Sequence, residues 1–151
     1  EIPASQVIDL LLTRSDPVRD TTISSRLFSG IDALECTWTG RRISGDFHVD
    51  HVIPYSLWHN NDLWNLLPAH PKVNNSKSDK LPSRELMIKR KDVIKGYWDM
   101  VSGTMPARFG NEVKRFTGKD YGSQWHEALF SAVVEAVEFT AIQRGAVRWE
   151  G

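Results

Sequence analysis

The chain has 151 residues, of which 40% are hydrophobic and 25% charged, and its formal net charge at pH 7 is zero. This length suits one domain with a substantial core and argues against two large ones. The composition is typical of a soluble globular protein and excludes a disordered chain, while the neutral charge argues against binding nucleic acid through the overall field of the protein.

Three further features bear on where the protein works. No stretch reaches the roughly 18 apolar residues of a membrane helix, and no signal-peptide pattern opens the chain, so we expect a cytoplasmic protein without a membrane partner. The single Cys36 excludes an internal disulfide and fits a reducing compartment. Because the sequence starts with Glu1 rather than Met, we also expect that further domains of a longer polypeptide could accompany it.

The first half of the chain changes from a helical to an extended pattern. Apolar residues at helical spacing predict a short helix over 3–12, which Asp16 and Pro17 end. Residues 34–51 predict two strands joined by turns, with Gly40 between the arms of the first hairpin. Pro54 ends the second extended run.

A second strand and a helix complete a small unit. Residues 59–62 form a polar loop, 63–70 predict a strand or extended segment, and 70–82 predict a helix that Pro71 opens and Pro82 closes. Strand, loop, strand and helix between residues 47 and 79 therefore form a ββα unit.

The rest of the chain, from residue 83 onward, is predicted to be all-helical. Two apolar stripes at helical spacing indicate core-facing surfaces rather than a ligand site. The stripes are Leu86, Met87, Ile94, Tyr97, Trp98 and Val101, and then Trp125, Leu129, Val133, Val137 and Ala141. The predicted fold class is therefore α+β, a single domain over 1–151 with a ββα core at about 34–83 and a helical extension at 84–151.

Basic residues gather after the ββα unit. Between residues 72 and 95 there are eight basic side chains and three acidic ones. Such a run is typical of a solvated helix face, although its position beside the candidate site favours contact with phosphates. The candidates for nucleic-acid binding are Lys72, Lys80 and Arg84, together with Arg41 and Arg42 at the turn of the first hairpin.

The dipeptide Asp50-His51 carries the clearest chemical signal. Neighbouring side chains of a strand point to opposite faces, so both reach one site only if the strand ends or bends there, which Pro54 favours. An oxygen donor at Asn74 on the following helix can meet the Asp50 carboxylate, and the two can hold one hard divalent cation such as Mg²⁺. A neutral His51 would then take a proton from the attacking water.

This combination of residues resembles the HNH motif of the ββα-metal nucleases, in the variant with Asn as its third letter. Residues 36–83, and above all the nine-residue step from Asn65 to Asn74, are similar to the HNH domains of CRISPR effector nucleases and of restriction-type bacterial proteins. The resemblance implies that Asp50 and Asn74 bind Mg²⁺ or Mn²⁺, and that His51 is the general base. It also implies that Asn65 orients the loop or the base and that Lys77 faces the phosphate.

The chain departs from many members of this family at the positions that bind a structural zinc. The expected knuckles offer only Cys36 and His70, whereas a zinc site needs four nitrogen or sulfur donors, so we expect no structural zinc. Apolar packing by Trp38, Trp64 and Val73 could replace the ion. Cys36 then serves as a small buried hydrophobe.

The sequence thus predicts a metal-dependent endonuclease that acts on nucleic acid, with DNA as the expected substrate. Two alternatives stay open: a module that binds nucleic acid without cleaving it, and a protein-interaction domain on the same fold. The complete set of Asp50, His51 and Asn74 argues against both, because binding alone needs none of the three together. His48 shares a strand face with Asp50 and could support it, although a packed or exposed role is also open.

Overall fold

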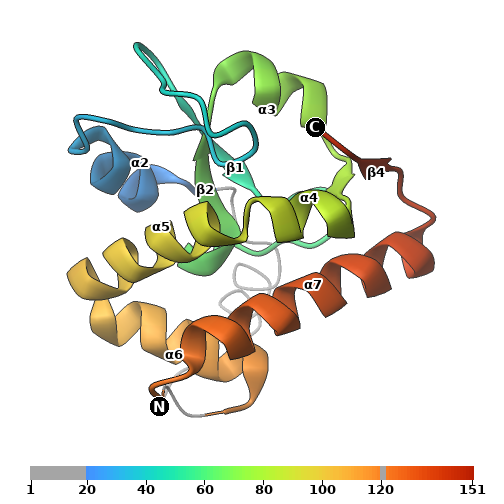
Figure 1. The fold of residues 1–151 in the computed structure, drawn as a ribbon. Coiled ribbons are helices and arrows are strands. Elements are labelled where there is room, and N and C mark those ends of the chain that lie inside the picture. Colours follow the sequence, from blue (N-terminus) through green and yellow to red (C-terminus); the bar gives the residue numbers. More distant parts are fainter. Residues whose placement is uncertain (1–19, 120–121) are drawn as a thin grey trace, which may run out of the picture.

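The computed structural model describes residues 20–119 and 122–151, and places a small two-stranded hairpin among packed helices (Figure 1). The α+β fold class is confirmed. The helix expected over 3–12 lies outside the described residues. Among the described residues, no helix has the length and apolar character needed to cross a bilayer.

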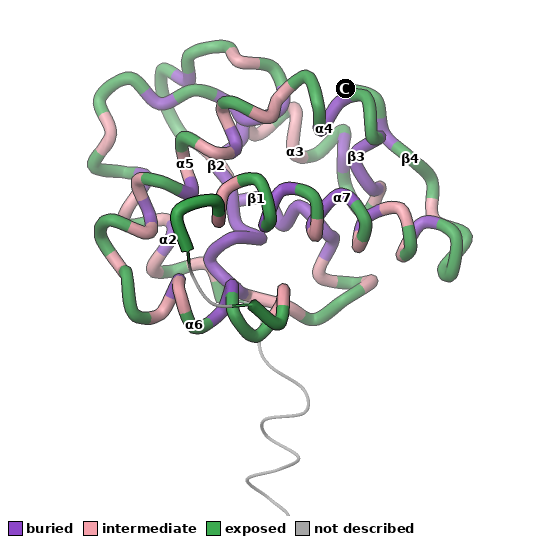
Figure 2. Tube along the Cα trace, turned by 60° about the horizontal axis from the view of Figure 1, so that its bottom comes forward, coloured by how far each residue is buried: buried purple, intermediate pink, exposed green. Residues whose placement is uncertain are grey.

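The hairpin pairs β1 (His48–His51) with β2 (Leu66–Ala69) in antiparallel register, with Asp50 opposite Leu67. A 3₁₀ turn, η1 (Leu63–Asn65), leads into β2. Most residues of both strands are buried, and the buried part of the tube in Figure 2 runs through the hairpin. The two predicted strands of the ββα unit are therefore confirmed, and they lie at the centre of the molecule.

The prediction of a first hairpin around Gly40, by contrast, is wrong, because the structure forms no pair of strands there. Glu35 and Arg42 form one isolated antiparallel bridge around a tight turn. Gly40 has a φ of +73° in this turn, and a Cβ there would meet the Arg90 guanidinium at 2.5 Å. Arg90 also donates to the Thr37 carbonyl at 2.8 Å. The turn is therefore held by a side chain 50 residues away in the sequence, a contact that local strand patterns do not encode.

Two helices flank the hairpin. The first, α2 (Thr22–Ser29), buries Phe28 and starts where the Asp20 carboxylate accepts a hydrogen bond from the Thr22 amide. The second, α3 (Pro71–Lys77), begins at a cap in which His70 accepts from the Lys72 amide. It ends earlier than residue 82, because Ser78 adopts a φ of +52°.

The helical extension follows and supplies much of the core. Its helices are α4 (Arg84–Lys89), α5 (Lys91–Thr104), α6 (Pro106–Thr117) and α7 (Trp125–Arg144). Both predicted stripes face inward, since Trp98 and Val133 are completely buried. Trp125 and Tyr97 are the partly buried members at the margins.

The prediction of an all-helical end is wrong at the last residues of the chain. Pro82 does not close a helix but belongs to β3 (Leu81–Pro82), which pairs in parallel with β4 (Arg148–Trp149). The buried Trp149 packs edge-on against Trp38, with ring centroids 6.2 Å apart. A strand of two residues is too short to show an alternating pattern.

Candidate active site

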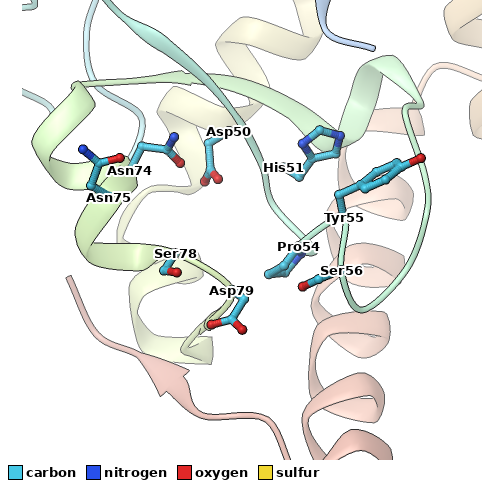
Figure 3. A pocket seen from close by; sticks show the side chains of 9 residues that line it. All are labelled: Asp50, His51, Pro54, Tyr55, Ser56, Asn74, Asn75, Ser78 and Asp79. Carbon is cyan, nitrogen blue, oxygen red and sulfur yellow. The ribbon is translucent and has the colours of Figure 1, made fainter. Parts of the chain in front are cut away.

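The end of β1 opens into a polar pocket of about 410 Å³. Asp50 and His51 both line it, together with Asn74 and Asn75 from α3 and Asp79 from the loop that follows (Figure 3). The strand stops at His51, so these adjacent side chains escape strict alternation and serve one cavity. The structure therefore brings together the three residues expected to carry the chemistry.

The Asp50 carboxylate is buried and bound on both oxygens. Trp38 donates its indole N–H to Oδ2 at 2.8 Å. The Lys77 ammonium lies 3.1 Å from Oδ2 and 3.3 Å from Oδ1. These contacts fix the rotamer of Asp50 and compensate its charge, as a buried carboxylate requires.

Lys77 differs from the expectation that it faces the phosphate. Its side chain is completely buried on the last turn of α3, and the ammonium also donates to the His51 carbonyl at 2.8 Å. A group with no exposed surface cannot meet the backbone of a nucleic acid at the protein surface. Lys77 instead ties α3 to the end of β1, where Asp50 and His51 lie.

Asn74 is oriented by the histidine that shares a strand face with Asp50. The amide nitrogen of Asn74 lies 3.0 Å from Nδ1 of His48. With this nitrogen held by His48, the amide oxygen turns toward Asp50, as Figure 3 shows. The observed contact of His48 is thus with Asn74, whereas the supporting role left open from the sequence concerned Asp50.

Sequence reasoning missed Asn61 as the partner of His51. The Oδ1 atom of Asn61 lies 3.0 Å from Nε2 of His51. Because an amide oxygen only accepts, this contact requires a proton on Nε2, and a neutral ring then carries its lone pair on Nδ1. The polar character of residues 59–62 indicated a loop but did not single out Asn61.

Asn65 binds the loop between the two strands. Its side-chain oxygen accepts from the Ile53 amide at 2.9 Å, and its nitrogen donates to the carbonyls of Asn60 at 3.1 Å and Ile53 at 3.3 Å. Asn65 has no exposed surface. It therefore binds the backbone of the loop that carries Asn61, and its role in orienting the loop or the base stays a prediction.

A buried carboxylate on α6 lies behind this loop. Glu112 is 8% exposed, and its Oε1 accepts from the Leu63 amide at 2.8 Å. Burial raises the pKa of Glu112 above its ordinary value of 4.5, and the nearby Asp62 acts in the same direction. The bonds from Leu63 and Arg108 oppose this rise without cancelling it.

This raised pKa predicts a pH dependence of stability. The folded protein binds the Glu112 proton more tightly than the unfolded chain, so the contribution of this group is greatest below pH 4.5 and is lost as the pH rises through the folded pKa. Relative to Glu112→Gln, the wild type should lose unfolding free energy as the pH rises from 4.5 through the folded pKa of Glu112. Above that pKa the difference should reach a plateau. Urea unfolding at a series of pH values measures it, and a difference independent of pH would contradict the prediction.

The residues expected to bind nucleic acid lie at the surface. Arg41, Arg42, Lys72 and Arg84 are exposed. Lys80 is half-buried, and its ammonium donates to the Ser76 carbonyl at 3.1 Å. Their accessibility permits contact with phosphates, and their role remains a prediction.

The segment around Cys36, for which the sequence predicts no structural zinc, is packed with apolar side chains. Cys36 has no exposed surface and belongs to the hydrophobic core, as do Trp38 and Trp64, and Val73 packs against this core. His70 caps α3 through Nδ1. The sequence reasoning named this apolar packing, but it did not find the contact between Arg90 and the turn at Gly40.

The donor set of the pocket fits a hard divalent cation. The Asp50 carboxylate and the Asn74 amide oxygen come from β1 and α3 and face the same cavity. Within residues 20–119 and 122–151, no three His, Cys, Asp or Glu side chains gather as metal ligands. These oxygen donors, with the Asp79 carboxylate also lining the pocket, leave coordination positions for water, and oxygen ligands suit a hard divalent cation.

Comparison with known proteins agrees with this geometry. Residues 36–83 match the HNH endonuclease family. A search of curated proteins gives no significant match for the chain. The matched segment runs from the turn at Cys36 through β1, β2 and α3 to Ser83, and so it contains Asp50, His51 and Asn74. The match supports an HNH endonuclease domain over this part of the chain.

Proposed function

We propose that this protein hydrolyses phosphodiester bonds of DNA with the help of a divalent cation. The observation that carries the proposal is the convergence of Asp50, His51 and Asn74 on one polar pocket within the HNH segment. The match of residues 36–83 to this family supports nuclease activity on nucleic acid. The metal, the choice of DNA and the roles of individual residues are our inference.

Asp50 and Asn74 would hold the cation, either Mg²⁺ or Mn²⁺. Such an ion, when bound, neutralises the charge that develops on the phosphate and on the leaving oxygen. Asp50 is presented in one rotamer by Trp38 and Lys77, and the amide of Asn74 is oriented by His48. Both ligands are thus arranged by the protein before a cation arrives, which reduces the entropy lost on binding.

His51 would act as the general base. His51 is only 2% exposed as a residue and its Nδ1 is buried, so a water molecule that it deprotonates would have to enter from the pocket that His51 lines. The bond from Nε2 to Asn61 keeps the proton on that nitrogen and leaves the other nitrogen as the acceptor. A base held in one tautomer contributes roughly 100- to 10,000-fold to the rate.

The exposed basic residues would hold the substrate backbone. Lys72 and Lys80 lie on and just beyond α3, which also carries Asn74, and Arg84 opens α4. Arg41 and Arg42 lie in the turn that precedes β1. Contacts of this kind position the phosphates and carry no sequence information of their own, so we infer weak base selectivity in this domain.

Plasmid cleavage and manganese binding together test the proposal. The purified protein should cleave supercoiled plasmid with Mg²⁺ or Mn²⁺ and leave it intact with EDTA. Asn74→Ala should lower the affinity for Mn²⁺ at least about tenfold, measured by calorimetry, because a ligand oxygen is lost.

Asn75→Ala is the matched control, since Asn75 lines the same pocket from the same helix but is exposed. It should bind Mn²⁺ like the wild type. Binding of plasmid without cleavage in any divalent metal would instead favour a module that binds nucleic acid and does not cut it.

A further inference from the structure

We propose that helix α6 of the helical extension positions the general base, with Arg108 and Glu112 as its positioning residues. Both lie outside the segment 36–83 that matches the HNH family. The inference rests on the proposed role of His51. It gives a function to a helix for which the sequence predicted only helical structure.

The contacts start from the loop that approaches His51. Asn61 meets Nε2 of His51 at 3.0 Å, as described above. The next residue, Asp62, donates its amide to the side-chain oxygen of Asn60 at 2.8 Å, which makes a local turn. This turn is short and polar, so its position depends on what it packs against.

The Glu112 side chain binds the backbone of the loop from the side of α6. Its Oε1 accepts from the amide of Leu63, two residues after Asn61, and its Oε2 accepts from Nε of Arg108 at 3.2 Å. Leu63 is 1% exposed, so its amide has little access to water as an alternative partner. A buried N–H of this kind holds its acceptor firmly, because leaving it unpaired is unfavourable.

Two arginines of α6 extend the contact over neighbouring loop residues. Arg108 also reaches the Asn61 carbonyl, with Nη2 3.4 Å from the oxygen. Arg115 donates to Oδ1 of the buried Asp62 at 3.0 Å. Three consecutive residues, 61 to 63, are therefore bound to one helix.

An aromatic stack keeps the helix and the loop in register. The ring of Phe116 stacks on Trp64 with centroids 4.2 Å apart, and Trp64 has no exposed surface. The indole N–H of Trp64 donates to Oδ2 of Asp62 at 3.0 Å. The loop is thus fixed at the Leu63 amide, at the Asp62 carboxylate and at the Trp64 ring.

The consequence concerns the geometry of catalysis rather than metal binding. If the loop shifts, the Asn61 oxygen leaves Nε2, and the His51 ring loses the contact that sets its tautomer and tilt. A displacement of about 1 Å at a reacting group can lower a rate by roughly 100-fold. Asp50 and Asn74 are held by Trp38, Lys77 and His48, none of which lies on α6, so the affinity for the cation should not change.

Kinetics of matched variants test this division. Glu112→Ala should lower kcat about 10- to 100-fold, while KM for DNA and the affinity for Mn²⁺ stay within about twofold of the wild type. Glu112→Gln retains an oxygen for the Leu63 amide and should restore most of kcat. The control is Glu138→Ala, because Glu138 also accepts from an arginine, Arg148 at 3.0 Å, but lies on α7.

A second variant covers the case in which Glu112→Ala does not fold. Arg108 has a side chain that is 36% exposed, so Arg108→Ala should fold while it removes the contacts to Asn61 and Glu112. We expect about a 3- to 10-fold loss of kcat with KM unchanged. Arg148→Ala, which breaks an ion pair of similar exposure, should have no effect on kcat.

A measurement on the metal-free protein separates this inference from the nuclease proposal. In Glu112→Ala, but not in Glu112→Gln, the Leu63 amide should exchange with solvent at least about tenfold faster, and the ¹⁵N resonances of the His51 ring should shift toward a mixture of tautomers. If Leu63 exchange accelerates while the His51 resonances stay unchanged, α6 has only a structural role and the inference is overturned. If instead the wild type cleaves no DNA in any metal, the proposed function fails, while the ring resonances still decide the positioning role.

Discussion

His51→Ala should abolish detectable plasmid cleavage while the protein remains folded and still binds Mn²⁺. Removal of a general base typically costs roughly 100- to 10,000-fold in kcat, which would lower plasmid cleavage to the background of most gel assays. The far-UV circular dichroism spectrum should match the wild type, because β1 keeps its pairing with β2 through backbone bonds. Calorimetry should give the wild-type affinity for Mn²⁺, since Asp50 and Asn74 remain.

His126→Ala is the control for this substitution. His126 also has a ring nitrogen bound to a side-chain oxygen, Oδ1 of Asp99 at 3.1 Å, but it lies on α7 away from the pocket. The His126→Ala variant should cleave plasmid at the wild-type rate. Cleavage by His51→Ala within about threefold of the wild type would refute the role of His51 as the base.

Lys77→Ala should have the largest effect on stability. Breaking a buried ion pair by removing one partner costs about 3–5 kcal/mol, because the remaining charge is left uncompensated. In this case the carboxylate of Asp50, which is 3% exposed, would keep only its bond from Trp38. Urea unfolding with EDTA present measures the loss, and Lys77→Met, which keeps most of the volume, should show a similar one.

Added Mn²⁺ should reduce this loss. A cation bound between Asp50 and Asn74 supplies a positive charge beside the carboxylate, and it stabilises the folded state by mass action. The gain in unfolding free energy on adding Mn²⁺ should therefore be larger for Lys77→Met than for the wild type. Equal gains would contradict the idea that the ammonium and the cation share one carboxylate.

Lys80→Ala tests whether a lysine near the buried Lys77 contributes to DNA binding rather than to stability. Lys80 is half-buried with its ammonium near the surface, so its removal should change the unfolding free energy by less than about 0.5 kcal/mol. The same change should weaken DNA binding and reduce the slope of log affinity against log salt by about 1. If Lys77→Ala behaved in this way instead, Lys77 would be a phosphate-binding residue.

The sequence predicted which three residues share the pocket better than it predicted what surrounds them. Asp50, His51 and Asn74 could be placed in one pocket because a strand end and the following helix determine their positions over a short stretch of chain. Lys77 was assigned to the wrong environment, since nothing in its neighbours distinguishes a lysine on the outer face of a helix from one on the inner face. Its burial depends on Trp38 and Asp50, which come from other elements.

The contacts of the fold that the sequence did not predict share one physical cause. Arg90 at the turn of Gly40, Glu112 behind Leu63 and the pairing of β3 with β4 all join residues far apart in the chain. Periodicity reports only which face of an element is apolar, and does not say which polar group on another element will meet it. The two core stripes of the extension were predicted because many apolar residues repeat the same local signal.

The contact between Trp149 and Trp38 links the last strand of the described chain to Asp50. Trp38 donates to Asp50, and Trp149 packs on its ring. A shortened product that stops before Arg148 would therefore lose the support behind this indole, although it would contain every residue of the segment 36–83. The segment 36–83 on its own would therefore present the Asp50 carboxylate less firmly than the described chain does, because part of the packing that holds its indole partner comes from residues outside that segment.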